Sequence, residues 1–325
     1  MSATYRGGEP VAEIVRSGFA ESFHRGSVAV TDPSGTLVTS IGDTASPVFP
    51  RSSNKPMQAL AMLRAGWEPA SAADLAIASA SHRGEPFHIA QVRSVLASAG
   101  LGEDRLQCPA DMPSDPGARH IVAAEGGDAG RVYMNCSGKH AGMLAACTAA
   151  GWDLATYRDP DHPLQRLIAA TVEELTGDTV AAVGVDGCGA PVLAVTLAGL
   201  ARAFARLVEA PEGTNERRVA DAMRINPKLV DGTRGPDHRM MSALSGLLAK
   251  GGAEGIHVLA APGVGAVAVK IDDGAGRAST PVALRAITQT LGLAVPEETK
   301  PEIDALLWPE ILGGGQPIGR LRTLL

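Results

Sequence analysis

The sequence predicts a mixed α/β fold of the α+β kind, in which an antiparallel sheet is backed by helices and carries a helical lobe. Two observations predict this class. Short apolar segments typical of strands occur as hairpin-like pairs near both ends of the 325-residue chain. Helical patterns dominate the centre between them, and paired strands favour an antiparallel sheet over a doubly wound parallel one.

The first strand pair is expected at His24–Asp32 and Thr36–Ile41, joined by a turn at Pro33–Gly35. Helical patterns follow, and Gly100 bounds the last of them. These helices are expected at Pro56–Ala65, Ala72–Ala78 and Pro86–Ala99, before a loop-rich stretch at Asp104–Ala129.

The second half of the chain contains helices and a further pair of strands. The apolar run Thr179–Val185 indicates a strand that ends in a tight turn at Asp186–Gly189. The C-terminal strand pair is expected at Ile256–Ala260 and Gly265–Ile271. Helices are expected at Lys139–Ala150, Pro163–Leu175, Val192–Val208, Asn215–Arg224, Met240–Leu248, Pro281–Leu291 and Pro301–Leu307.

The sequence contains no internal repeat or linker, so we expect one compact unit over residues 1–325. Its sheet should come from about residues 1–50 and 255–325, and a helix-rich central lobe from about residues 55–250. A sheet built from both ends of the chain with a helical lobe inserted is the architecture of serine β-lactamases and penicillin-binding enzymes.

Charge and composition exclude several classes of partner. A net charge of −6 argues against nucleic acid and anionic membranes, and aromatic residues make up only 3% of the chain. The sequence shows no signal-peptide pattern and no apolar run near the roughly 20 residues of a membrane span. We therefore expect a cytoplasmic protein whose cysteines stay reduced.

The basic residues are unevenly chosen, with 23 arginines and 6 lysines. Only lysine can readily lose its proton and act as a base or a ligand. Lysines in recognisable patterns are therefore candidates for chemistry, whereas Lys228, Lys250 and Lys300 are taken as ordinary positive charges.

Ser52 and Lys55 form an S-x-x-K motif at the start of a helix. Residues three apart share one helix face, so the lysine can take the proton of the serine hydroxyl. The positive helix terminus would also stabilise an oxyanion. A helix-capping serine followed by a surface lysine fits the spacing equally well, and the motif alone is weak.

Cys136 and Lys139 lie three residues apart at a loop-to-helix junction, and Cys188 follows a strand in a glycine-rich turn. Two thiolates, one nitrogen and a water would complete a tetrahedral zinc site. Lysine is a rare ligand, and spacing alone favours two buried free cysteines instead.

Two further polar positions stand out. Ser81 begins a loop after an apolar helix, where ordinary helix capping explains most of the pattern. Lys270 lies late on a predicted strand before an Asp-Asp-Gly turn, which is usual for a solvated edge residue. It also loosely resembles the strand lysine that β-lactamases place opposite their nucleophile.

Taken together, these segments resemble the bacterial L-asparaginase II family, the thermolabile, zinc-containing type. The matching segments follow one another through nearly the whole chain. They are Glu13–Gly18, Glu21–Gly26, Arg51–Gln58, Ser81–Glu85, Asn135–Met143, Asp186–Pro191, Ala268–Gly274 and Leu312–Gly319.

The resemblance implies hydrolysis of the side-chain amide of L-asparagine on a fold similar to serine β-lactamases. It makes Ser52 the nucleophile with Lys55 as its base, and Ser81 and Lys270 a second serine–lysine pair. It makes Cys136, Lys139 and Cys188 the Zn²⁺ ligands, and it places Arg51, His140 and Asp186 around the substrate. Homodimers are usual in the family.

One segment departs from the family pattern. Asp231–Asp237 is less regular than the glycine-rich family version, which puts the side-chain specificity of the enzyme in doubt. The alternatives are another serine–lysine hydrolase on this fold, such as a glutaminase, an esterase or a β-lactam hydrolase, and a non-catalytic zinc-binding sensor. The cysteine–lysine cluster speaks against the other hydrolases, and the two intact serine–lysine pairs against the sensor.

Overall fold

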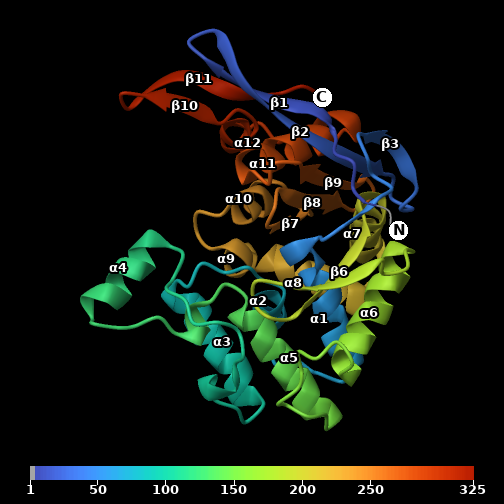
Figure 1. Cartoon of the computed structure of the whole chain (residues 1–325), viewed down its shortest axis with the longest axis vertical. Helices are drawn as coiled ribbons and strands as arrows, with labels where there is room; N and C mark the ends of the chain where they lie inside the picture. The colour runs from blue at the N-terminus through green and yellow to red at the C-terminus, as the bar shows by residue number, and fades with distance from the viewer. Residues whose placement is uncertain (1–3) are drawn as a thin grey trace.

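A computed structural model describes residues 4–325 (Figure 1). Its centre is an eight-stranded antiparallel sheet in the order β10-β11-β1-β2-β9-β8-β7, with β3 paired to β2 beside this path. The strands are β1 (Glu9–Arg16), β2 (Phe19–Thr31), β3 (Leu37–Ile41), β7 (Leu248–Gly252), β8 (Ile256–Ala261), β9 (Gly265–Ile271), β10 (Glu310–Gly313) and β11 (Gln316–Thr323).

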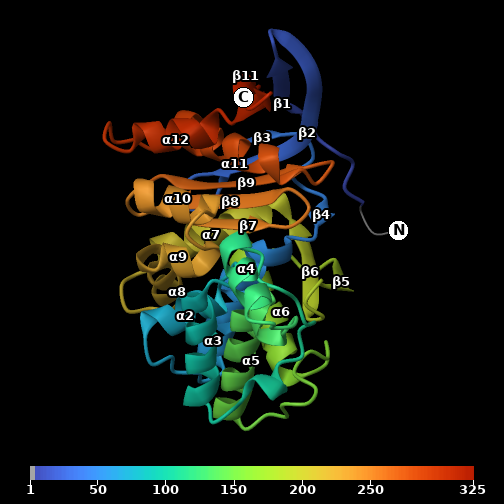
Figure 2. The same ribbon diagram turned by 90° about the vertical axis from the view of Figure 1, so that its left-hand side faces the viewer.

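The central strands β8 and β9 are buried on both faces, which explains their nearly continuous apolar sequences. Helix α7 (Leu197–Glu209) packs on one face of the sheet, and α11 (Gly276–Arg285) on the other, followed by η4 (Ala286–Thr290) and α12 (Lys300–Leu307). Figure 2 shows α11 and α12 above the sheet, α10 beside it, and α7 with most of the other helices below it.

The helical lobe lies below the sheet and begins with the short helix η1 (Arg51–Asn54). Its remaining helices are α1 (Lys55–Arg64), α2 (Ala72–Ala78), α3 (Pro86–Ser98), η2 (Glu103–Arg105), α4 (Pro116–Ala124), η3 (Arg131–Tyr133), α5 (Ser137–Ala150), α6 (Pro163–Thr176), α8 (Asn215–Ile225), α9 (Pro227–Asp231) and α10 (Pro236–Ala243). None of the helices within residues 4–325 combines the length and apolarity needed to cross a membrane.

A second, three-stranded antiparallel sheet stands beside the lobe in the order β4-β6-β5. Its strands are β4 (Pro47–Val48), β5 (Ala182–Val185) and β6 (Pro191–Thr196). The β5–β6 hairpin therefore carries the Asp186–Gly189 turn at its tip, while β4 leads directly into η1.

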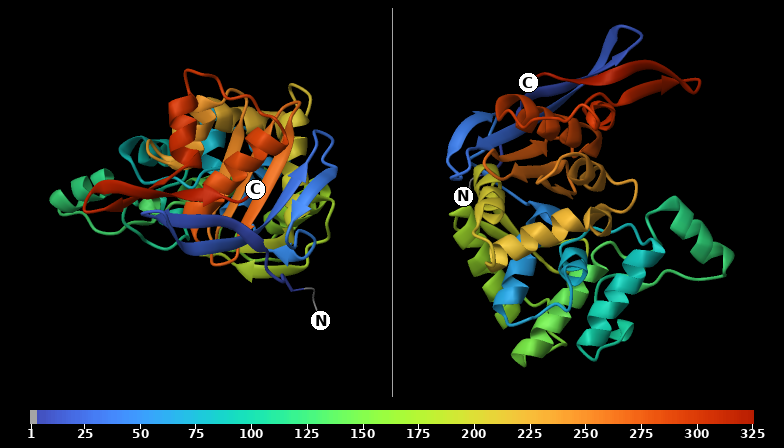
Figure 3. Two further views of the ribbon diagram at one scale, coloured as in Figure 1. Left: turned by 90° about the horizontal axis from the view of Figure 1, so that it is seen from above. Right: turned by 180° about the vertical axis from the view of Figure 1, so that it is seen from behind.

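The β1–β2 and β10–β11 hairpins extend together beyond the helices as a twisted wing (Figure 3). Strand β11 pairs along β1, so the first and last strands of the chain lie side by side in the sheet. Phe19, Phe23 and Leu312 on this wing are exposed.

The predicted class is confirmed: an antiparallel sheet drawn from both ends of the chain is backed by helices and carries a helical lobe. Several boundaries differ. The predicted helix Val192–Val208 is strand β6 followed by α7, because the Thr196 hydroxyl accepts a hydrogen bond from Gly199 N and caps a new helix. The predicted helix Met240–Leu248 ends at Ala243, and β7 begins at Leu248.

Candidate functional site

The S-x-x-K segment lies where the lobe meets the edge strand β7, and a glycine permits this contact. The Ser53 hydroxyl donates to Lys250 O at 3.0 Å. A Cβ atom on Gly252 would lie 2.6 Å from Pro50 O and 3.0 Å from Ser53 Oγ. Only glycine at position 252 therefore lets η1, with Ser52, lie directly against the sheet.

Two glycines bring the Cys136 segment to the same place. A Cβ atom on Gly138 would lie 2.3 Å from Ile77 O, and one on Gly142 would lie 2.8 Å from Ala78 Cβ. Since these residues are four apart, they form one bare stripe on which α5 approaches α2. The first turn of α5, with Lys139, therefore lies beside the end of α2, which leads into Ser81.

Lys55 links the two segments. Its ammonium is fully buried and donates to Ala80 O at 2.5 Å and to the Ser81 hydroxyl at 2.9 Å. Burial and the charges of Lys250 and Lys139 together lower the pKa of Lys55 to about 8, although the charge of Cys136 acts in the opposite direction. An amine with this pKa can exchange protons near neutral pH.

The predicted metal ligands lie together. Lys139 Nζ donates to Cys188 Sγ at 3.1 Å, and the thiols of Cys136 and Cys188 share a hydrogen bond. The hydrogen bond from Cys188, helped by the charges of Lys55 and Lys139, holds the pKa of Cys136 well below its usual value. The pKa of Cys188 is raised by that same hydrogen bond and by burial, so the two thiols share a single negative charge.

Arg51 and Asp186 form the outer wall of this cluster. Arg51 Nε donates to Asp186 Oδ1 at 2.8 Å, and Arg51 has a left-handed backbone with φ of 51°. Such a conformation is uncommon in a residue other than glycine and is held here by the surrounding structure. The ion pair joins the residue before Ser52 to the turn that carries Cys188.

His140 lies deeper in α5, fully buried. Its Nδ1 is 2.6 Å from the hydroxyl of Tyr157, which itself accepts a hydrogen bond from Gln107 N. With its proton on Nε2, His140 accepts from Tyr157 at Nδ1 and presents Nε2–H as a donor. Among residues 4–325, this buried Nε2 has no hydrogen-bond partner.

Lys270, the predicted partner of Ser81, has other neighbours in the structure. It lies on β9, two strands away from β7, so its backbone is about 10 Å from that of Gly252. Its ammonium donates to Ile271 O at 2.5 Å and lines a cavity of about 430 Å³ together with Arg51, Glu254, Tyr5 and Phe49. The hydroxyl of Ser81 is bonded to Lys55 instead.

Lys250 is the residue that sequence reasoning missed. Its sequence context predicts an ordinary positive charge, but its side chain is 1% exposed and its charge lowers the pKa of Lys55. Its Nζ donates to Gly251 O at 2.7 Å and lies 3.8 Å from Asp237 Oδ2. The sequence Lys250-Gly251-Gly252 indicates such a position, because paired glycines allow another backbone to approach closely.

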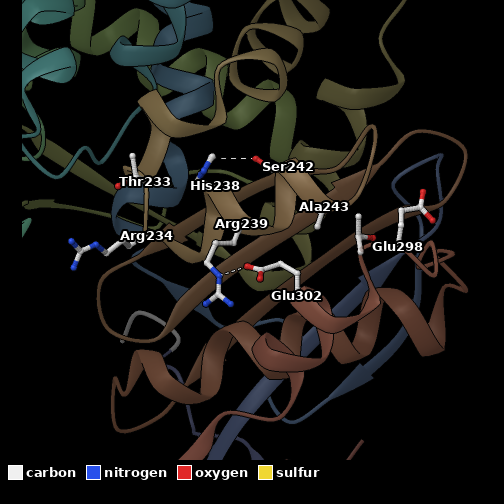
Figure 4. Close-up of a pocket in the computed structure, with 9 residues that line it drawn as sticks. Thr233, Arg234, His238, Arg239, Ser242, Ala243, Glu298 and Glu302 are labelled. Atoms are coloured by element: carbon white, nitrogen blue, oxygen red, sulfur yellow. Dashed lines mark hydrogen bonds and ion pairs between the residues drawn. The ribbon is translucent and has the colours of Figure 1, made fainter.

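A different cavity, of about 620 Å³, opens between α10 and α12 and contains none of the predicted site residues (Figure 4). Arg239 and Glu302 form an ion pair across it, and His238 contacts Ser242 on its floor. No group of three or more histidine, cysteine, aspartate or glutamate side chains positioned to hold a metal occurs in the described part of the chain. The predicted set contains two cysteines and a lysine.

Comparison with known proteins agrees with this arrangement at the level of the family. The family model described as L-asparaginase II matches residues 12–323. No curated protein matches the chain.

Several solved structures are similar to the chain. A protein named Mglu, in its native form, is 15% identical with a TM-score of 0.44, over 81% of this chain and 63% of that one. Its glutamate form is 15% identical with a TM-score of 0.47, over 84% of this chain and 62% of that one. A β-lactamase from Mycobacterium bovis is 17% identical with a TM-score of 0.43, over 82% of this chain and 93% of that one. The chain thus spans about 63% of the length of the first structure.

The fold and the site define an α+β protein with a buried serine–lysine–cysteine cluster at the junction of its sheet and its helical lobe. The match over residues 12–323 goes further. The chain belongs to the L-asparaginase II family.

Proposed function

We propose that the protein is an amidohydrolase that converts L-asparagine to L-aspartate and ammonia, with Ser52 as its nucleophile. One observation carries the proposal. The buried Lys55 amine, three residues after Ser52, hydrogen-bonds Ser81 within a cluster that also holds Lys250 and Lys139. Several buried cations around one amine favour its neutral form, which is the form that a base requires.

In the first half of the reaction, Lys55 takes the hydroxyl proton of Ser52, and Ser52 Oγ bonds to the side-chain amide carbon of asparagine. The tetrahedral intermediate carries its negative charge on the former amide oxygen, next to the cationic cluster. The C–N bond then breaks, ammonia leaves with the proton held by Lys55, and an aspartyl ester remains on Ser52.

In the second half, water attacks the ester carbon, the bond to Ser52 Oγ breaks, and the serine recovers a proton. Ser81 relays that proton, because its hydroxyl lies 2.9 Å from Lys55 Nζ. The family resemblance implies Lys270 as the lysine of the second serine–lysine pair. We assign it to Lys250, whose buried ammonium acts on Lys55 and whose carbonyl holds the residue after Ser52.

The walls of the site are suited to an amino-acid substrate. The unpartnered Nε2–H of His140 can donate to a substrate oxygen, since a buried donor without an acceptor is costly. Arg51 and Asp186 offer one positive and one negative group for the carboxylate and ammonium of asparagine. Their mutual hydrogen bond keeps both groups in fixed positions.

The donor set of Cys136, Lys139 and Cys188 fits Zn²⁺. The observation that supports this is chemical: two cysteine sulfurs and an amine lie together in a buried cluster. Two sulfurs, one nitrogen and a water make a tetrahedral set. When bound, the ion would supply a Lewis-acidic centre that orients a substrate oxygen.

Ammonia release tests the proposal most simply. The purified protein is incubated with L-asparagine and separately with L-glutamine, and the Ser52→Ala and Ser34→Ala variants are compared. Ser34 lies in the turn between β2 and β3, where its hydroxyl donates to Asp32. We expect release from asparagine that Ser52→Ala abolishes and Ser34→Ala preserves. Faster ammonia release from glutamine would show that glutamine is the preferred substrate. Full activity in Ser52→Ala would show that Ser52 is not the nucleophile.

The expected homodimer and cytoplasmic location belong to the same proposal. They are supported by the family resemblance. Light scattering of the purified protein measures the first, and fractionation of cells that express the chain measures the second.

A further inference from the structure

A chain of buried hydrogen bonds leads from the far face of the sheet to the nucleophile segment. Thr280 Oγ1 on α11 lies 3.1 Å from His257 Nδ1, and His257 Nε2 lies 2.8 Å from Asp237 Oδ1. Asp237 Oδ2 accepts from Gly251 N at 2.8 Å and lies 3.8 Å from Lys250 Nζ.

The last link is the Ser53 hydroxyl, which donates to Lys250 O at 3.0 Å. Every side chain of this chain of contacts is 8% exposed or less. It crosses four elements, α11, β8, α10 and β7, before it reaches η1. The residue next to Ser52 is therefore connected to α11 without passing through solvent.

Asp237 is the charged centre of this network. Burial acts to raise the pKa of its carboxyl, but the charge and hydrogen bond of His257, the charge of Lys250 and the amide of Gly251 outweigh burial and lower it. As a carboxylate, Asp237 can only accept, so the proton between it and His257 belongs to Nε2. That proton fixes the orientation of the imidazole ring.

A buried carboxylate is expensive and adds little net stability in most proteins. Here it has a specific cation to hold. Within the described residues, Asp237 is the only carboxylate within 4 Å of the buried Lys250 ammonium. The same carboxylate binds the amide that follows Lys250, so it constrains both the side chain and the backbone of β7 at this point.

We propose that Asp237, held in place by His257 and Thr280, is the positioning residue of Lys250. It sets the Lys250 ammonium and the β7 backbone against η1, so that Lys250 faces the Lys55–Ser81 pair. This assignment rests on the proposed function, in which Lys250 supports the chemistry of Ser52. Asp237 itself touches neither substrate nor the reacting atoms.

A second carboxylate extends the support to Ser81. Asp231 Oδ2 accepts from Asp237 N at 3.0 Å, and Asp231 Oδ1 accepts from Arg83 at 2.9 Å. Arg83 Nε also donates to Asp231 O at 2.6 Å. The segment Asp231–Asp237, which departs from the family pattern, thus carries two buried carboxylates that brace the Ser81 loop and β7 together.

The decisive variant is Asp237→Asn, which keeps the shape of the side chain and removes its charge. The control is Asp178→Asn, a partly buried carboxylate that accepts from Thr196 N and Oγ1 in another part of the molecule. For Asp237→Asn we expect kcat to fall by at least about tenfold, as when orienting groups are lost, with KM nearly unchanged. Asp178→Asn should lower the melting temperature but leave kcat near that of the parent protein.

If Asp237→Asn does not fold, Thr280→Val and His257→Gln decide, because each removes one link and leaves the carboxylate. Both should lower kcat without raising KM. An unchanged kcat in folded Asp237→Asn, or in both of these variants, would overturn the proposal. An equal loss of kcat in Asp178→Asn and Asp237→Asn would also overturn the proposal, since the effect could then be explained by lower stability alone.

A spectroscopic readout separates this proposal from the proposed function. In protein labelled with ¹⁵N-lysine, the Nζ resonance of Lys250 is identified as the one missing in Lys250→Met. We expect Asp237→Asn to shift this resonance and leave that of Lys300 in place. If the parent protein releases no ammonia but the shift occurs, the function fails and the positioning stands; an unmoved resonance overturns the positioning.

Discussion

At the scale of single residues, burial separates lysines that look alike in the sequence. The sequence predicts an ordinary positive charge for both Lys250 and Lys300. In the structure, Lys250 on β7 is buried beside α10 and η1, whereas the side chain of Lys300 is 53% exposed. Periodicity could not distinguish them, because the environment of Lys250 is built by Asp237, Ser53 and Lys55, which are distant in sequence. The S-x-x-K motif, by contrast, is local and was found directly.

Replacing Lys250 by methionine should therefore abolish most of the activity. Met keeps the apolar stem but removes the cation next to Lys55 and leaves Asp237 without its counter-charge. We expect kcat to fall by about 100-fold or more and stability to drop by about 3–5 kcal/mol, the usual cost of breaking a buried ion pair. Steady-state kinetics and thermal unfolding measure both, and Lys300→Met should change neither; equal behaviour of the two variants would contradict the assignment.

Asp231 predicts a pH dependence of stability. Burial and the charge of Asp237 raise the pKa of Asp231 to about 6 from 3.8. The folded protein thus holds this proton more tightly than the unfolded chain. The resulting stabilisation is complete below the unfolded pKa and is lost as pH rises through about 6.

The Asp231→Asn variant cannot lose a proton, so its melting temperature relative to the parent protein should rise between about pH 5 and about pH 7. A change of a few degrees is expected. The contact with Arg83 is already part of this raised pKa, so what remains between Asn and a protonated Asp231 is an offset that does not vary with pH. A difference that is flat over this range would contradict the raised pKa.

At the scale of elements, the strands that were predicted are those with apolar side chains. β9 and most of β2 were found, because Val267, Val269 and Ile271 follow one another in a short apolar run. β7 was missed, since Gly251 and Gly252 hide its strand pattern. The hairpin β10–β11 was missed because its side chains are mostly exposed and its pairing with β1 spans the whole chain.

Gly252 provides a direct test of how η1 is placed. Gly252→Ala would force its Cβ to within 2.6 Å of Pro50 O, so η1 must move away from β7. We expect a loss of about 1–3 kcal/mol in stability and a clear fall in kcat. Gly251→Ala is the matched control, because its nearest neighbour would be 3.7 Å away. Comparable kinetics in the two variants would show that this contact is not needed.

At the scale of the whole molecule, the site exists because the sheet and the lobe meet. Ser52, Ser81, Cys136 and Cys188 come from four separate parts of the lobe and its small sheet, and Lys250 comes from the main sheet. Resemblance named most of this set, but only the fold shows that Lys55 is the lysine bonded to Ser81 and that Lys270 lines a neighbouring cavity. No local sequence pattern could assign these different positions to Lys55 and Lys270.

Metal content is a property of the assembled molecule as well. If Cys136, Lys139 and Cys188 hold Zn²⁺, the protein purified in the presence of zinc should contain about one ion per chain, a single four-ligand site. Cys188→Ser should lose that ion, while Cys147→Ser, a buried cysteine elsewhere on α5, should keep it. Elemental analysis of the desalted proteins gives the answer, and equal zinc in both variants would place the metal elsewhere.

The role of Ser52 as the nucleophile is tested most directly by trapping the acyl-enzyme. The protein is mixed with L-asparagine, quenched with acid during turnover, digested and analysed by mass spectrometry. We expect one aspartyl group, acid-stable and removed by mild base, on the peptide that contains Ser52, and none in Ser52→Ala. Steady ammonia release with the aspartyl group on another residue, or with no acylated peptide under any quench condition, would contradict it.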